Sequence, residues 1–83
     1  MRYKIVAIRD RALDAFGQPA FVASTGQAIR SFGDEINNKR EGNALSQHPE
    51  DFDLYFLGIY VDEDGSFECV RPQQIAVGKD LVR

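Results

Sequence analysis

The sequence contains a single cysteine, Cys69, and a single histidine, His48. One cysteine cannot form an internal disulfide, so nothing in the chain indicates an oxidising compartment. A lone histidine before a proline, with no cysteine or second histidine near it, is far more often a turn residue than a metal ligand or a catalytic base. We therefore expect no metal site, and we expect Cys69 to be a small buried hydrophobic side chain.

The chain also lacks a long apolar run. The longest, Leu54–Val61, has eight residues, whereas a helix that spans a bilayer needs about 20. No basic segment followed by an apolar stretch opens the sequence, as a secretory leader would. We expect a cytoplasmic protein that does not associate with membranes.

Catalytic motifs are missing as well, since the chain has no Gly-rich phosphate loop and no nucleophile elbow. Glu50, Asp51 and Asp53 form an acidic cluster, but acids with no base or nucleophile beside them are typical of a helix start. The acidic segment Asp62–Gly65 lies between two expected strands and lacks the spacing and flanking helices of a calcium loop. It is typical of a hairpin tip that keeps a sheet edge soluble. We predict a non-enzymatic protein with no catalytic residue, metal or cofactor.

The 83 residues are sufficient for one domain, residues 1–83, and we expect the tail from about 78 to 83 to be loosely held. Tyr3–Arg9 is rich in β-branched residues and predicts a strand. Ala20–Ala23 predicts a short edge strand, because Pro19 cannot donate to a ladder at its start. Asp53–Val70 predicts a β-hairpin around Asp64-Gly65, a dipeptide that favours tight turns.

One amphipathic helix of about sixteen residues is expected between the second strand and the hairpin. Ser24 and Gln27 have the spacing of a capping box. The stripe of Ala28, Ile29, Phe32 and Ile36 predicts the buried side, and Lys39-Arg40 predicts the end of the helix. The fold class is therefore α+β: a mostly antiparallel sheet of about four strands, in the sequence order β-β-α-β-β, with one covering helix.

The hairpin's first strand is apolar on both sides, which indicates that both faces of the sheet are covered. With a loop of two or four residues, alternation places Phe56, Gly58 and Tyr60 on one face with Phe67 and Cys69. The opposite face then carries four apolar side chains in a row: Tyr55, Leu57, Ile59 and Val61. No second helix is available to cover them, so we predict that they form the interface of a homo-oligomer, most simply a dimer.

The formal net charge is −3, and its distribution along the chain is uneven. Residues 1–40 carry a net charge of +3, and residues 41–83 carry −6. Basic side chains interleaved with an aromatic ring at Tyr3 can follow a phosphate backbone while the ring stacks on a base. The candidate nucleic-acid-binding residues are Arg2, Lys4, Arg9, Arg11 and Arg30. The alternative is that Tyr3 belongs to the core and the charges are solvated surface groups.

Several stretches of the chain, from about residue 3 to Phe67, resemble the small nonstructural protein of gokushovirus-type microviruses, which are single-stranded DNA phages. The most distinctive is His48–Tyr55, a histidine-proline-acid-acid-Phe string followed by Asp-Leu-Tyr. The other matching segments are Arg9-Asp10, Ala15-Phe16-Gly17 before Pro19, Phe21-Val22, Ala28–Phe32 with Asp34-Glu35, Asn43-Ala44-Leu45, and Leu57-Gly58.

This resemblance implies a nonstructural protein that acts in the cytoplasm of the bacterial host during phage genome replication. It implies a role in favouring single-stranded DNA synthesis, by binding DNA, and it places Arg30 at a family-typical arginine position. No catalytic motif is known for that family, so it implies no active site. Two functions stay open at this point. One is binding of single-stranded DNA, and the other is capture of a replication, packaging or host protein without DNA contact.

Overall fold

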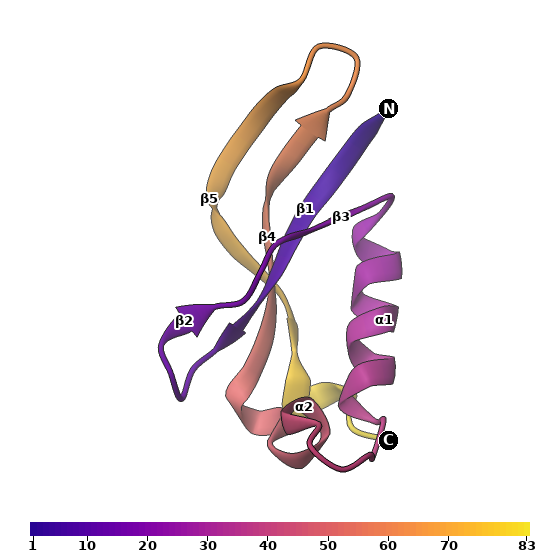
Figure 1. Ribbon diagram of the computed structural model, residues 1–83, viewed down its shortest axis with the longest axis vertical. Helices are drawn as coiled ribbons and strands as arrows, with labels where there is room; N and C mark the ends of the chain where they lie inside the picture. Colours follow the sequence, from indigo (N-terminus) through magenta and orange to yellow (C-terminus); the bar gives the residue numbers. More distant parts are fainter.

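Two long strands form the centre of the sheet in the computed structural model, which describes residues 1–83. β1 (Arg2–Asp10) pairs with β4 (Phe52–Val61), and β4 pairs on its other side with β5 (Ser66–Val77). Two short strands, β2 (Ala15–Phe16) and β3 (Ala20–Val22), both pair with β1. All pairings are antiparallel, and the order is β2-β1-β4-β5 with β3 also beside β1 (Figure 1).

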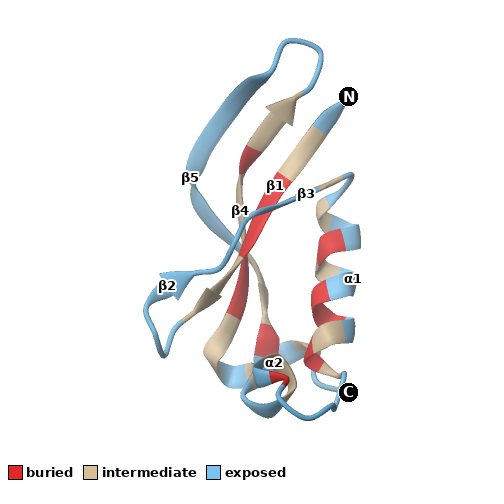
Figure 2. Ribbon diagram, in the orientation of Figure 1, coloured by how far each residue is buried: buried red, intermediate tan, exposed pale blue.

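The helix α1 (Thr25–Ile36) covers one face of this sheet. It begins as predicted, because the Ser24 side chain accepts a hydrogen bond from the backbone N–H of Gln27. The apolar stripe is also confirmed as core. Ala28, Phe32 and Ile36 are buried against Val6 and Leu54 of the two central strands (Figure 2).

The helix ends earlier than predicted, at Ile36 and not near Lys39-Arg40. Asn37 caps it, because its backbone N–H donates to the Glu35 and Gly33 carbonyl oxygens and its side-chain Nδ2 donates to the Gly33 carbonyl oxygen (2.7 Å). The buried Asn43 adds hydrogen bonds from its Nδ2 to the carbonyl oxygens of Glu35 (3.1 Å) and Asn38 (2.8 Å). Each of these two carbonyls also accepts a backbone N–H, from Asn38 and Arg40 respectively, so Asn43 adds a second donor at the end of the helix. An asparagine side chain from the following segment therefore replaces the basic side chains that we expected there.

The remaining segments close the end of the domain beyond the helix. α2 (Ala44–Gln47) and the 3-10 turn η1 (Pro49–Asp51) lead into β4, and Glu50 and Asp51 lie in the first turn of η1, where acids are typical. The tail, which we expected to be loosely held, forms a second 3-10 turn, η2 (Gly78–Leu81). It is tied to α1 by hydrogen bonds from Asn37 Nδ2 to the Leu81 carbonyl (2.9 Å) and from the Arg83 N–H to Asn37 Oδ1 (2.9 Å).

A β-bulge at Leu57 in the middle of β4 changes the predicted faces of the sheet. Ile5 pairs with Gly58 whereas Val6 pairs with Phe56, so Leu57 is an extra residue without a partner on β1. The alternation reverses at this point. Phe56 consequently lies on the helix side with Val6, and Tyr55 lies on the opposite side with Gly58 and Tyr60.

The predicted common face of Tyr55, Leu57, Ile59 and Val61 is therefore wrong. Tyr55 and Ile59 lie on opposite faces, because the bulge stands between them. The four residues do not form one continuous apolar surface. The existence of a dimer is a separate question, and it stays a prediction.

Other features of the sheet also differ from the sequence-based picture. An additional strand, β2, lies between the two strands expected before the helix, so the order of elements along the chain is β-β-β-α-β-β and not β-β-α-β-β. β5 continues through Pro72 to Val77, where we expected pairing to end. The four-residue loop between Val61 and Ser66 is confirmed. Cys69 is exposed on β5 and not buried (Figure 2), because no element covers this part of the outer strand.

Candidate nucleic-acid interface

The face of the sheet opposite α1 carries six aromatic side chains, and we call it the aromatic face. Its members come from all five strands: Tyr3, Phe16, Phe21, Tyr55, Tyr60 and Phe67. Alternation on each strand aligns them, since paired residues of neighbouring strands point to the same side of a sheet. None of the six belongs to the cluster that packs beneath the helix.

Four of these rings form a connected group toward the hairpin tip. The Tyr60 ring lies 6.4 Å from Tyr3, 5.6 Å from Phe21 and 5.0 Å from Phe67, measured between ring centroids. Phe21 also contacts Phe67 at 6.4 Å. Yet Phe21 is 52% exposed and Phe67 is 57% exposed. The rings thus support one another while leaving a large share of their surface to solvent, which is the arrangement that a stacking platform needs.

The other two aromatic side chains form an edge-to-face pair at the opposite end of the sheet. Phe16 and Tyr55 lie 5.2 Å apart, with their ring planes at 72°. The Tyr55 hydroxyl donates a hydrogen bond to Gln74 Oε1 on β5 at 3.3 Å. This hydrogen bond joins the aromatic pair to a polar pocket on the same face of the sheet.

The polar pocket has a volume of about 370 Å³ and lies where β1 and β5 end and β4 begins. It combines three cationic side chains with two acidic ones. Its lining residues are Arg9, Arg11, Asp53, Tyr55, Gln74, Val77, Lys79 and Asp80. Such a mixture can hold an anionic group and a hydrogen-bond donor together.

The structure brings together only two of the five basic residues proposed for nucleic-acid binding. Arg9 and Arg11 line the polar pocket. Arg2 and Lys4 alternate with Tyr3 and so lie on the other side of β1, toward its opposite end. Arg30 is exposed on α1, which covers the opposite face of the sheet. The five side chains therefore do not share one surface.

Acidic neighbours hold several of these cations. Arg2 Nη2 lies 2.6 Å from Glu68 Oε1, and this hydrogen bond raises the pKa of the Arg2 guanidinium. The Asp14 carboxylate likewise accepts a hydrogen bond from Arg9 and raises the pKa of Arg9. Arg11 Nε lies 3.0 Å from Asp53 Oδ2. A phosphate must compete with these carboxylates, so each contact contributes less than a free cation would.

Sequence reasoning missed Lys79, which lines the pocket and forms no ion pair. It is in the tail, and only the three-dimensional fold places it beside Arg9 and Arg11. Phe16 and Phe21 were missed for a different reason. Each lies on a very short strand, for which two or three residues give no periodicity to read.

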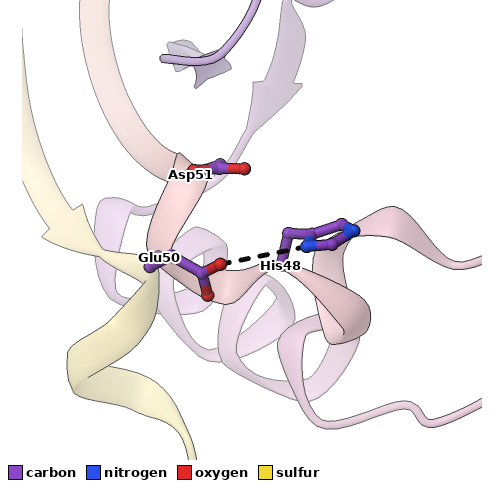
Figure 3. A group of neighbouring side chains, drawn as sticks. All are labelled: His48, Glu50 and Asp51. Carbon is purple, nitrogen blue, oxygen red and sulfur yellow. Dashed lines mark ion pairs between the residues drawn. The ribbon is translucent and has the colours of Figure 1, made fainter.

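A cluster of three possible metal ligands lies elsewhere, on the turn before β4 (Figure 3). His48 Nδ1 is 3.8 Å from Glu50 Oε1, and one carboxylate oxygen of Asp51 is within 4.8 Å of both donor groups. His48 and Glu50 are exposed. Exposed acids beside a histidine are common on protein surfaces, and no further feature of this turn points to an ion.

The fold defines a small antiparallel α+β domain with one helix-covered face and one aromatic face. Among known protein families, the model of the family described as Phage ORF5 protein matches residues 3–81 of the chain. The chain belongs to this phage protein family. No curated protein and no solved structure matches it. The expected phage character is thereby confirmed, whereas the assignment to gokushovirus-type microviruses stays a prediction.

None of the helices has the length and apolar character needed to cross a membrane.

Proposed function

We propose that this phage protein is a non-enzymatic accessory of genome replication that binds single-stranded DNA on its aromatic face. The observation that carries this proposal is the group of contacting rings that includes the half-exposed Phe21 and Phe67. The same face also carries the Phe16–Tyr55 pair and a pocket with three cations. Stacking of a base on an aromatic side chain contributes about 1–3 kcal/mol and tolerates any sequence. Bases are free to stack on protein only where the strand is not paired.

The charge distribution predicts weak binding with a shallow dependence on salt. The net charge is −3, and two of the pocket's three cations are already paired with carboxylates. On single strands, each neutralised phosphate contributes about −0.7 to the slope of log K against log salt. Three contacts give a slope of about −2. The aromatic rings, not the cations, then supply most of the affinity.

The test is fluorescence anisotropy with a labelled 15-nucleotide single strand and the matching duplex, at two salt concentrations. We expect binding to the single strand and much weaker binding to the duplex. The double variant Phe21→Leu/Phe67→Leu keeps apolar side chains but removes two rings, so its affinity should fall at least tenfold, corresponding to about 1.4 kcal/mol or more.

Val82→Ala is the matched control, because Val82 is also an exposed apolar side chain but follows η2 and is not on the aromatic face. Its affinity should equal that of the wild type. Equal affinity of the ring variant and the control would contradict stacking on this face.

The second candidate function is capture of a protein partner, and one observation favours it. An apolar groove of about 400 Å³ lies between α1 and β3, with Phe32 among its apolar lining residues and Glu35 among its few polar ones. A groove of this composition fits an apolar peptide segment. If the wild-type protein shows no affinity for single strands at low salt, this function takes the place of the first.

A further inference from the structure

Asp53 is the one buried carboxylate in the domain, and one of its oxygens has no hydrogen-bond partner. The residue is 3% exposed. Oδ2 pairs with Arg11 Nε, whereas Oδ1 accepts no hydrogen bond. A buried polar atom left without a partner is destabilising, so buried groups of this kind are nearly always satisfied by protein, water or ligand.

The position of Asp53 in the sheet connects this unsatisfied oxygen to the polar pocket. Asp53 pairs with Arg9 on β1 and with Val77 on β5, so it lies on the central strand of the aromatic face. It lines the pocket together with the cations Arg9 and Lys79. The Tyr55 ring, two residues farther along β4, provides an aromatic wall.

A ligand that complements this pocket needs three chemical features at once. It needs an N–H donor for the Asp53 carboxylate, an anionic group for Lys79 and the arginines, and a flat ring to lie against Tyr55. A nucleotide unit of a single strand has all three, provided that its base carries an exocyclic amino group. The pocket volume of about 370 Å³ is sufficient to hold a base.

We propose that the polar pocket is a base-selective subsite, in which Asp53 accepts a hydrogen bond from the amino group of cytosine, adenine or guanine and discriminates against thymine. This inference rests on the proposed single-strand binding. Thymine presents carbonyl oxygens on both sides of its single N–H. Those oxygens oppose a carboxylate, so the same pocket disfavours it.

Binding involves an exchange of partners at Arg11. Oδ1 is covered by its neighbours in the free protein. The Arg11 side chain is 46% exposed, so we infer that it turns outward to a phosphate and leaves the carboxylate to the base. This movement also breaks the hydrogen bond from Arg11 to the Glu50 carbonyl oxygen. Arg11 then pairs with the phosphate in place of Asp53, and Asp53 accepts a hydrogen bond from the base in place of Arg11. The phosphate thereby couples general strand binding to base selection.

The decisive experiment compares two homopolymeric 12-nucleotide strands, one of 5-methylcytosine and one of thymine, at pH 8. These bases both carry a methyl group at position 5, and they differ by the amino group and the adjacent ring proton. We expect the wild-type protein to bind the 5-methylcytosine strand about tenfold more tightly, the typical effect of one hydrogen bond to a charged group. A single buried water on Oδ1 would instead give equal affinities.

Asp53→Asn should reduce this tenfold preference to about twofold or less, because the amide is a weaker acceptor. Glu41→Gln is the control, since it also removes one carboxylate charge, but Glu41 is exposed, forms no ion pair and lies outside the pocket. It should keep the preference. Melting curves show whether each variant is folded. If Asp53→Asn does not fold, the affinities of the wild-type protein for the two strands still decide whether the pocket selects bases.

The outcomes separate the two proposals. Equal binding of both strands overturns the base-selective subsite and leaves single-strand binding intact. A preference that survives in folded Asp53→Asn also overturns it, because another group would then be reading the base. Binding of neither strand overturns the proposed function together with the subsite.

Discussion

Replacing Gly58 by alanine tests whether the bulge in β4 specifies the sheet. Gly58 has φ of +151°, a conformation that residues with a side chain rarely adopt. A Cβ atom at this position would lie 2.4 Å from the Glu68 carbonyl oxygen and 3.1 Å from Cys69 Cα. Both atoms belong to the backbone of β5, the strand that pairs with β4 at this point. The strand can move away only by breaking this pairing.

The magnitude follows from two contributions. The unfavourable backbone conformation costs about 1–3 kcal/mol, and loss of one ladder hydrogen bond adds about 1 kcal/mol. We therefore expect Gly58→Ala to lower the free energy of unfolding by about 3 kcal/mol. A domain of this size is stable by about 4–12 kcal/mol, and it loses about 4–8 °C of melting temperature per kcal/mol. The variant should melt about 12–24 °C below the wild type.

The assay is thermal unfolding followed by far-UV circular dichroism, with Gly26→Ala as the matched control. Gly26 lies in the first turn of α1, and no heavy atom lies within 4 Å of a Cβ built there. Alanine also favours the helix over glycine by up to about 1 kcal/mol. The control should therefore melt at or above the wild-type temperature. If the two variants melt within a few degrees of each other, the bulge in β4 does not require glycine at position 58.

Three further predictions concern stability. Phe32→Ala removes a buried aromatic side chain from the sheet-facing side of α1 and should destabilise the domain by about 3–5 kcal/mol in chemical unfolding. A loss below about 1 kcal/mol would contradict its place in the core. Asn43→Ala removes both hydrogen bonds that end α1 and should cost about 1–3 kcal/mol, measured in the same way, and an unchanged midpoint would refute this role. Hydrogen bonds from Ser66 lower the pKa of Asp64 below its usual 3.8, so their contribution is present above pH 3.8 and is lost as the pH falls through the lowered value. Ser66→Ala should accordingly have a lower urea midpoint than the wild type at pH 7 and the same midpoint in strong acid. A difference that persists in strong acid would show that the effect does not come from the Asp64 carboxylate.

The elements that sequence reasoning predicted correctly are those with local causes. The helix begins at Ser24 because its own side chain caps the backbone three residues later. The hairpin turns where an Asp-Gly dipeptide permits it, and Gly65 has the positive φ of 73° that this turn requires. The buried stripe of α1 follows from helical periodicity alone. Each of these signals lies within a few residues of the feature that it specifies.

The elements that were mispredicted depend on partners distant in the chain. The end of α1 is stabilised in part by Asn43, which is outside the helix. Lys79 reaches the polar pocket only because η2 is bound to α1. The bulge at Leu57 had one local signal, the glycine that follows it within an otherwise apolar strand. Strict alternation, applied without regard to that glycine, assigned half of β4 to the wrong face.

The same bulge determines whether the candidate site exists as one surface. Tyr55 and Tyr60 are five residues apart, so regular alternation would place their rings on opposite faces of β4. The extra residue at Leu57 brings both onto the aromatic face. Without it, the polar pocket would have no aromatic wall, and the rings near the hairpin tip would be separated from the cations. Because Gly58 allows the bulge, any folded fraction of Gly58→Ala should bind single strands less tightly than an equally destabilised Phe32→Ala protein, whose altered residue lies on the buried side of α1. Equal affinities of the two folded variants would show that the bulge contributes stability alone.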